Sequence, residues 1–240
     1  MAKNDMTDSV NCGIVPSLRR TAVLTLHSAT DSSGTIVRLC AVSAGIPLRV
    51  RMHPFSGPLP REVLAMNPAG TLPVLVTPQG PVSEAGAALL WLSDSFGLGP
   101  PTGDDSRPAF LRWLFFLSNT LAADLRPLIW PERFNAADEK AGQITLAAGR
   151  FLQALGHVEE GARLAPGLFA PPGALAFFSL MLARWATLYS AGPVPWFNLD
   201  AFPTLSELAG AAEALPAVMR VARSEGLGRH PFSMPASAAV

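Results

Sequence analysis

Hydroxyl side chains gather in front of two stretches that have the apolar spacing of helices. Ser32 and Ser33 lie near the end of the segment His27–Gly34, which is dense in Ser, Thr, Asp and Gly. Ser83 and Glu84 stand before the second helical pattern. The unpaired amides at a helix N-terminus favour anions, and a hydroxyl beside them adds a further hydrogen bond. The chemistry available at both places is therefore the binding of an anionic group.

Other kinds of chemistry find little support. Cys12 and Cys40 form no CxxC pair, so neither a disulfide framework nor a cysteine zinc site is predicted, and we expect no metal. Cys40 lies inside a helical pattern and is expected to pack as a small hydrophobe. The sparse, unpaired cysteines indicate a reducing, cytoplasmic compartment. Eighteen basic residues balance 18 acidic ones with no basic run, which argues against nucleic-acid binding.

The chain of 240 residues, 49% hydrophobic and 15% charged, is long enough for a sizeable core. Its first 20 residues are polar and lack the apolar segment of a secretory signal. The charge-free stretch 164–183 has the length of a membrane span, but Pro166, Pro171 and Pro172 interrupt it. We therefore expect no membrane segment, and a buried helix over 174–189.

The first half of the chain alternates between strand and helix patterns. Strands are expected at 22–26, 48–52 and 72–76, with a further return of the chain through Val82. Helices are expected at 36–44, 61–66 and 84–94, the last capped by Ser83. The first strand, helix and second strand form a βαβ unit, which predicts a parallel strand pair.

The second half is expected to be helical throughout. Residues 97–108 are rich in Gly and Pro and read as a linker. Apolar stripes then recur at helical spacing, Thr204 and Glu207 have the form of a capping box, and Pro216 starts a short last helix. We predict a flexible tail over 1–20, a first domain over 21–96, the linker, a helical domain over 109–228 and a second flexible tail over 229–240.

Three spaced motifs resemble the cytosolic glutathione transferases, in particular the bacterial members. They are the segment Val37–Pro47, the segment Asn67–Leu75 with its Asn-Pro-x-Gly pattern, and Ser83-Glu84-Ala85 with the apolar helix after it. The resemblance covers about residues 21 to 228. It implies an α/β thioredoxin-like N-terminal domain followed by an all-α C-terminal helical bundle.

The resemblance also implies where glutathione would bind. Pro73 would follow a cis peptide, so that the backbone of Leu72 pairs with the cysteinyl part of glutathione. The helix after Glu84 would receive the γ-glutamyl carboxylate, and Glu84 its ammonium group. Ala85 replaces the serine of the family, and the loss of one hydrogen bond to a charged group costs about 1.5–3 kcal/mol. No certain partner for the glycyl carboxylate is visible, although Arg61 and His53 are candidates.

Catalysis would need a donor that stabilises the glutathione thiolate. Ser33 falls where some bacterial relatives carry a cysteine, and Ser32 lies beside it, so both are candidate catalytic residues. Thr30 and Ser28 stay open as alternatives. The only tyrosine, Tyr189, lies outside the first domain, which excludes activation by a first-domain tyrosine. Helix capping is the competing interpretation of the two serines.

The hydrophobic co-substrate would bind between the domains, against the helix that carries Trp113, Phe116 and Thr120. Core packing is the competing interpretation of these aromatic residues. The resemblance implies a homodimeric transferase that conjugates glutathione to, or uses it to reduce, a small hydrophobic electrophile, as in detoxification. The alternatives are a catalytically inactive protein of the same fold that acts as a binding or regulatory partner, and a carrier for an apolar ligand.

Overall fold

A four-stranded sheet and the helices packed on it form the first part of the molecule. The computed structural model describes residues 23–134, 140–190 and 196–238, and the expected N-terminal tail, 1–20, lies outside them. The strands are β1 (Leu24–Ser28), β2 (Leu48–Met52), β3 (Val74–Thr77) and β4 (Gly80–Ser83), in the order β2-β1-β3-β4. β1 pairs parallel with β2 and antiparallel with β3, and β3 pairs antiparallel with β4. The predicted βαβ unit is thus confirmed.

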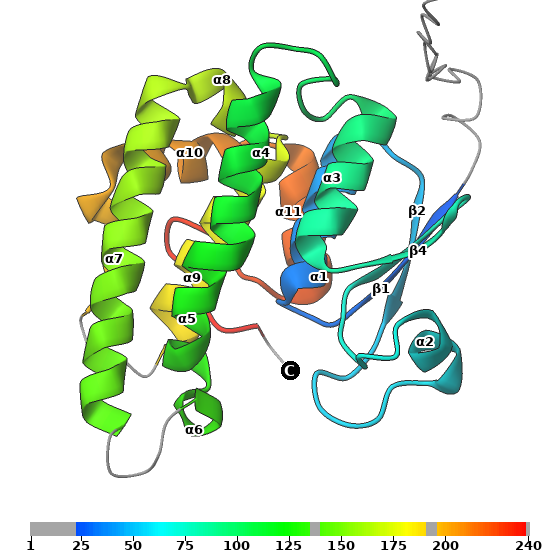
Figure 1. The fold of residues 1–240 in the computed structure, drawn as a ribbon, viewed down its shortest axis with the longest axis horizontal. Coiled ribbons are helices and arrows are strands. Elements are labelled where there is room, and N and C mark those ends of the chain that lie inside the picture. Colours follow the sequence, from blue (N-terminus) through cyan, green and yellow to red (C-terminus); the bar gives the residue numbers. More distant parts are fainter. Residues whose placement is uncertain (1–22, 135–139, 191–195, 239–240) are drawn as a thin grey trace, which may run out of the picture.

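Three helices accompany the sheet. α1 (Ser33–Ser43) and α3 (Ala85–Phe96) lie between the sheet and the rest of the molecule, whereas α2 (Arg61–Met66) lies on the other side (Figure 1). Burial raises the pKa of the Cys40 thiol in α1 well above its usual range, as expected of a cysteine that packs as a hydrophobe.

Helices make up the second part. They are α4 (Arg107–Phe116), the π-helical turn η1 (Leu117–Leu121), α5 (Ala122–Ile129), α6 (Pro131–Phe134), α7 (Lys140–Leu164), α8 (Pro166–Phe169), α9 (Ala174–Tyr189), the 3-10 turn η2 (Leu199–Ala201), α10 (Pro203–Glu213) and α11 (Pro216–Glu225). This arrangement confirms a thioredoxin-like sheet followed by a helical bundle. Among the described residues, no helix combines the length and apolar character that crossing a bilayer requires.

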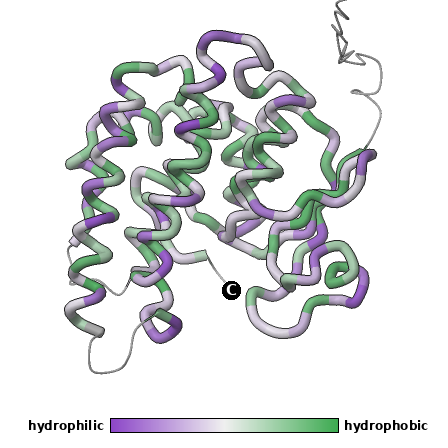
Figure 2. Tube along the Cα trace, in the orientation of Figure 1, coloured by the Kyte–Doolittle hydropathy of each residue, from purple (hydrophilic) through white to green (hydrophobic). Residues whose placement is uncertain are grey.

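α9 is the central helix, and α1 packs directly against it and against α11. Its residues are buried along almost its entire length, which matches the apolar character predicted for 174–189. The outer helix α7 instead alternates hydrophobic and hydrophilic residues, and the loop between α3 and α4 is hydrophilic (Figure 2). α1 therefore touches both parts of the molecule.

Two predicted helix caps are wrong. Ser83 is the last residue of β4, and Glu84 occupies the cap position of α3 without a side-chain hydrogen bond. Thr204 lies inside the first turn of α10, where its amide and that of Leu205 donate to the carboxylate of Glu159 at 2.7 and 2.9 Å. A carboxylate from α7 thus caps α10 in place of the local capping box.

The segment 229–238 also departs from the expected flexible tail. Phe232 is only 2% exposed, and the amides of Phe232 and Ser233 donate to the carboxylate of Glu213, both at 2.8 Å. Further carbonyl groups of this segment bind a buried arginine described below. Burial and these hydrogen bonds fix the segment against the helical part (Figure 1).

Candidate functional site

Ser32 is the N-cap of α1. Its hydroxyl accepts from the amide of Gly34 at 3.2 Å and donates to the carbonyl of Ala29 at 2.7 Å, while its own amide donates to the hydroxyl of Thr35 at 3.0 Å. These bonds complete a capping box. The hydroxyl of Ser32 is thereby occupied, and Ser32 is 9% exposed. Of the two predicted catalytic serines, Ser32 has the geometry of a cap.

Ser33 is the first residue of α1 and is partly exposed. Its hydroxyl donates to the backbone carbonyl of Leu72 at 3.3 Å. Leu72 and Pro73 are joined by a cis peptide bond, as the resemblance implied. Asn67 holds the preceding loop, since its side-chain amide donates to the carbonyl and the hydroxyl of Thr71 at 2.9 and 3.0 Å. The start of α1 and the Leu72 backbone therefore lie side by side.

The start of α3 belongs to the same region. Val74 of β3 pairs with Ser83 of β4, so the residues just before Val74 and just after Ser83 come from adjacent strand ends. Glu84 is exposed and Ala85 is 8% exposed. The pairing thus brings the N-terminus of α3 next to the cis peptide, and with it next to Ser33.

Ser118 of η1 faces the first turn of α3. A Cβ atom added at Gly86 would lie 3.4 Å from both the Cβ and the hydroxyl oxygen of Ser118. The Ser118 hydroxyl donates to the side-chain oxygen of Asn119 at 2.7 Å. A hydroxyl from the helical part therefore lies close to the helix start at which Ala85 has none. No motif in the sequence pointed to this residue, because η1 and α3 are joined only through packing.

Backbone strain marks the same two helix starts. Asp31 (φ +50°) and Glu84 (φ +70°) are the non-glycine residues with positive φ in the described ranges. Asp31 directly precedes the N-cap of α1, and Glu84 is the N-cap of α3. Such conformations cost on the order of 1–3 kcal/mol each and gather at functional sites. Positive-φ residues, the uncapped start of α3 and the cis peptide thus lie in one region.

Asp31 binds the central helix α9 through its carboxylate. Nε and Nη2 of Arg184 donate to it at 3.0 and 2.7 Å, the indole of Trp185 at 2.9 Å and the hydroxyl of Tyr189 at 2.6 Å. The side chain of Arg184 is 0% exposed. Its remaining donors go to the carbonyls of 227, 231 and 236 at 2.8–3.2 Å. Burial and the Asp31 carboxylate raise the pKa of Tyr189, so its hydroxyl stays a donor at neutral pH.

Glu225, the last residue of α11, binds the same turn of α1 from the other side. Its carboxylate accepts from the amide of Asp31 at 3.1 Å, the hydroxyl of Thr35 at 2.7 Å and the guanidinium of Arg38 at 2.9 Å. One hint of the buried Arg184–Asp31 pair is visible in the sequence. A single arginine, Arg184, stands in an otherwise apolar helix, and such a charge requires a buried partner.

Gly34 allows the strand and the helix to approach closely. A Cβ atom at this position would lie 2.1 Å from the hydroxyl oxygen of Ser28 at the end of β1. Ser28 is fully buried and its hydroxyl donates to the carbonyl of Ala29 at 3.1 Å. Of the alternative hydroxyls, Ser28 is therefore enclosed, whereas Thr30 is exposed.

Two histidines pair beside the sheet. Nδ1 of His27 and Nε2 of His53 are 2.9 Å apart, and the rings are stacked with centroids 5.1 Å apart. Burial, followed by the charge of His53, lowers the pKa of His27. The pairing engages one ring nitrogen of His53, a candidate partner of the glycyl carboxylate, and Arg61 is exposed. Among the described residues, no group of three or more His, Cys, Asp and Glu side chains is arranged to hold a metal ion.

The predicted co-substrate residues divide into two groups. Trp113 is 7% exposed, packs on Phe169 of α8 with ring centroids 5.6 Å apart, and lies against Gly161 of α7. Phe116 packs edge-on against Trp113 at 5.5 Å and His157 of α7 at 6.4 Å. The Trp113 ring is therefore enclosed by the helical core, which argues against its predicted role in co-substrate binding, whereas Phe116 is partly exposed. Thr120, on η1, is partly exposed.

An aromatic contact joins the two parts of the molecule at another place. Phe55, in the loop after β2, stacks on Trp130 at the end of α5, with centroids 6.2 Å apart and 65% of Phe55 exposed. The guanidinium of Arg133 lies 5.3 Å from the Trp130 ring. Phe55 and Trp130 thus supply apolar surface that the predicted set of residues did not include.

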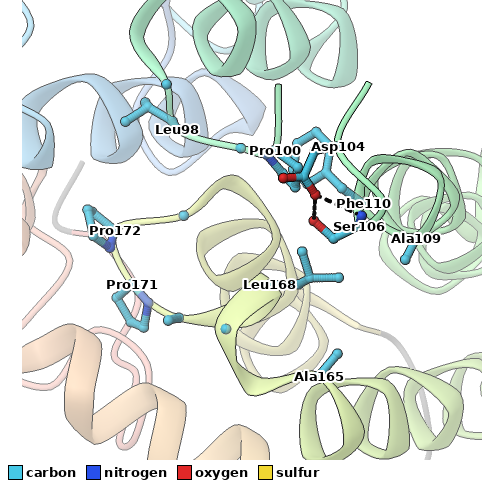
Figure 3. A pocket seen from close by; sticks show the side chains of 15 residues that line it. Leu98, Pro100, Asp104, Ser106, Ala109, Phe110, Ala165, Leu168, Pro171 and Pro172 are labelled. Carbon is cyan, nitrogen blue, oxygen red and sulfur yellow. Dashed lines mark hydrogen bonds between the residues drawn. The ribbon is translucent and has the colours of Figure 1, made fainter. Parts of the chain in front are cut away.

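A groove of about 810 Å³ lies elsewhere, between the α3–α4 loop and α8 (Figure 3). Its lining is apolar except for Asp104 and Ser106. The amide and the hydroxyl of Ser106 donate to the Asp104 carboxylate at 2.8 and 2.5 Å, so that carboxylate is engaged. None of the residues singled out from the sequence for glutathione or its co-substrate lines this groove.

Comparison with known proteins places the fold. No family model matches the chain, and no curated protein is similar to it in sequence. Among solved structures, the beta-class glutathione S-transferase of Sphingomonas chungbukensis is 19% identical, with a TM-score of 0.68 over 85% of this chain and 100% of that one. The glutathione transferase of Methylococcus capsulatus is 20% identical, with a TM-score of 0.67 over 86% and 100%. A glutathione transferase homologue from Sulfitobacter, solved with bound glutathione, is 17% identical, with a TM-score of 0.69 over 84% and 98%.

The sequence identities are low, whereas the structural similarity covers 84–86% of this chain and 98–100% of the three solved chains. It includes the four-stranded sheet and most of the helical second part. The chain therefore has the fold of the cytosolic glutathione transferases.

Proposed function

We propose that the protein is a glutathione transferase that conjugates glutathione to, or uses it to reduce, a small hydrophobic electrophile. The observation that carries the proposal is the contact between Ser33 and the carbonyl of Leu72 next to the cis peptide. It brings a hydroxyl, the N-terminus of α1 and the partly exposed Leu72 together. The solved structure with bound glutathione supports the choice of thiol.

In this proposal, Ser33 is the catalytic residue. A thiol with a pKa near 8.5 is only a few per cent ionised at neutral pH, and lowering that pKa by about two units requires about 2.7 kcal/mol of preferential stabilisation of the anion. The Ser33 hydroxyl and the positive end of the α1 helix dipole act together on the sulfur. Ser32 acts indirectly, because its capping bonds hold the start of α1 in place.

The backbone of Leu72 and the start of α3 bind the peptide part of glutathione. The amide and carbonyl of Leu72 pair with the cysteinyl backbone, with Pro73 setting their direction. The amides after Glu84 receive the γ-glutamyl carboxylate. Ala85 offers no hydroxyl, and Ser118 lies close enough to the same turn to supply one from the helical part.

The co-substrate binds beside Phe116 and Thr120 and against the apolar surface of Phe55 and Trp130, which replace the buried Trp113 in this role. We extend the proposal to a cytoplasmic homodimer, and the 49% exposure of Phe115 on α4 supports a partner on that face.

Titration calorimetry with reduced glutathione tests the proposal, with the parent protein compared with Ala85→Ser. We expect binding in the micromolar to low-millimolar range, about 10- to 150-fold tighter in the variant if the new hydroxyl reaches the carboxylate. Ser118→Ala, expected to weaken binding, serves as the matched change on the opposite wall. Binding followed by turnover on a panel of electrophiles would support the enzyme. Binding without turnover would favour the inactive alternative, and no binding at millimolar glutathione would refute the proposal.

A further inference from the structure

The contact between Asp31 and the central helix has no part in the function proposed so far. Asp31 lies two residues before Ser33, yet its side chain binds residues that are more than 150 positions away in the chain. We propose that Asp31 is a positioning residue, which uses the buried Arg184 to hold the start of α1 in the geometry that stabilises the thiolate. This inference rests on the function proposed above.

Hydrogen bonds to both oxygens fix the orientation of the Asp31 carboxylate. One oxygen accepts from Arg184 and Trp185, and the other accepts from Arg184 and Tyr189. The backbone amide of Asp31 is bound as well, by Glu225. Side chain and backbone are thus held by two different helices, α9 and α11. The conformation with φ +50° persists because these contacts determine it.

Charge neutralisation is the second part of the argument. An unpaired carboxylate this close to Ser33 would oppose a thiolate on the sulfur. Arg184 removes that conflict, since it is completely buried and its charge is directed to Asp31. Arg38 neutralises Glu225 in the same way. The two carboxylates therefore order the turn without adding net negative charge to the anion site.

The arrangement links the site to the C-terminal segment. Nη1 of Arg184 donates to the carbonyl of Pro231 at 2.9 Å, and Nη2 donates to that of Ala236 at 2.8 Å. Arg184 thus contacts the segment 229–238 and the start of α1 at once. Correct placement of Ser33 depends on the helical part of the chain as well as on the sheet.

The test compares Asp31→Asn with the parent protein by three readouts: kcat/KM, KM for glutathione, and the pKa of the bound glutathione thiol from its ultraviolet absorbance. The variant keeps the shape of the side chain and removes its charge. If Asp31 acted through charge alone, its removal would lower the thiol pKa, because Arg184 would remain positive. A positioning role predicts the opposite shift, with a fall in kcat/KM of about tenfold to hundredfold and a smaller change in KM.

Asp94→Asn is the matched control. Asp94 also pairs with an arginine across the two parts of the molecule, since Arg107 donates to it at 2.6 and 3.1 Å, but it does so far along α3 from the anion site. We expect the control to leave the thiol pKa and kcat/KM unchanged. Circular dichroism and thermal unfolding establish that each variant is folded at the assay temperature.

If Asp31→Asn fails to fold, a double variant with Trp185→Phe and Tyr189→Phe tests the same inference. It keeps the ion pair and removes two of the hydrogen bonds to Asp31, and we expect about a threefold fall in kcat/KM with a raised thiol pKa. Folded variants with an unchanged or lowered thiol pKa would overturn the inference and leave the proposed function intact. A parent protein that binds no glutathione would refute the proposed function, and this inference with it.

Discussion

The two helix starts that form the candidate site are built in opposite ways. At α1 the side chains around the first turn are engaged: Ser32 caps it, and Asp31 and Glu225 tie it to α9 and α11. At α3 the cap position is Glu84, with no side-chain cap, and Ala85 adds no hydroxyl. The first is rigid and neutralised, as a site that must ionise a thiol requires, whereas the second offers bare amides, as recognition of a carboxylate requires. Placement is therefore most demanding at α1.

Removing the buried arginine should have the largest effect on the rigid side. Arg184→Met leaves the Asp31 carboxylate buried without its ion pair, which typically costs about 3–5 kcal/mol in the free energy of unfolding. Urea unfolding measures the loss. The control is Arg163→Met, which removes the exposed pair with Glu160 on α7 and should change stability little. Equal losses in both variants would contradict the distinction.

Adding a methyl group to each helix start sharpens the comparison. Gly34→Ala puts a Cβ atom 2.1 Å from the hydroxyl of Ser28, and we expect a loss of about 1–3 kcal/mol together with lower activity. Gly86→Ala meets Ser118 only at 3.4 Å and should be tolerated much better. Thermal unfolding of both variants gives the answer. A loss of stability in Gly86→Ala as large as that in Gly34→Ala would mean that the two starts are equally tight.

The two serines of α1 separate folding from chemistry. Ser32→Ala removes the N-cap and should cost about 1 kcal/mol of stability. Ser33→Ala removes a hydroxyl at the first helical position that bonds to one carbonyl, and should change stability less while it lowers kcat. Unfolding and steady-state kinetics on both variants test this division. It is wrong if Ser32→Ala loses more activity than Ser33→Ala at equal folded fraction.

The smallest effect is expected at the histidine pair, whose side chains bond to each other and not to either helix start. The pKa of His27 is lowered in the folded protein, so the unfolded chain binds the proton more readily. Stability should therefore be full above the ordinary value of 6.5 and fall as the pH drops from there toward the lowered value. Melting temperatures from pH 8 to pH 5 follow this loss. His27→Asn should flatten the profile, and an unchanged slope would assign it to other groups.

Local patterns predicted most of the fold correctly. The expected helices at 61–66 and 174–189 coincide with α2 and α9, because their limits are set by nearby Pro, Gly and apolar residues. The strand expected at 22–26 is instead β1 (Leu24–Ser28). Its end is shifted because His27 and Ser28 are buried through contacts with His53 and α1, which leave no apolar signature.

Contacts between distant segments escaped prediction. Glu159 caps α10 from a distant helix. Arg184 binds the segment 229–238, and Trp113 packs on α7 and α8, so these features also depend on partners far away in the sequence. The same holds for Asp31 within the candidate site. Motifs identified the backbone elements of the proposed anion site, whereas packing between the two parts decides which side chains surround it.

The most direct test of the central claim is the pKa of the glutathione thiol when it is bound to the protein. Ultraviolet absorbance of the thiolate is followed against pH for the parent protein, Ser33→Ala and Ser32→Ala. We predict a thiol pKa about two units below the ordinary value of 8.5 in the parent, and a rise toward that value in Ser33→Ala that exceeds any rise in Ser32→Ala. A bound thiol that titrates near 8.5 in the parent, or a pKa unaffected by Ser33→Ala, would contradict the assignment of the start of α1 as the catalytic anion site.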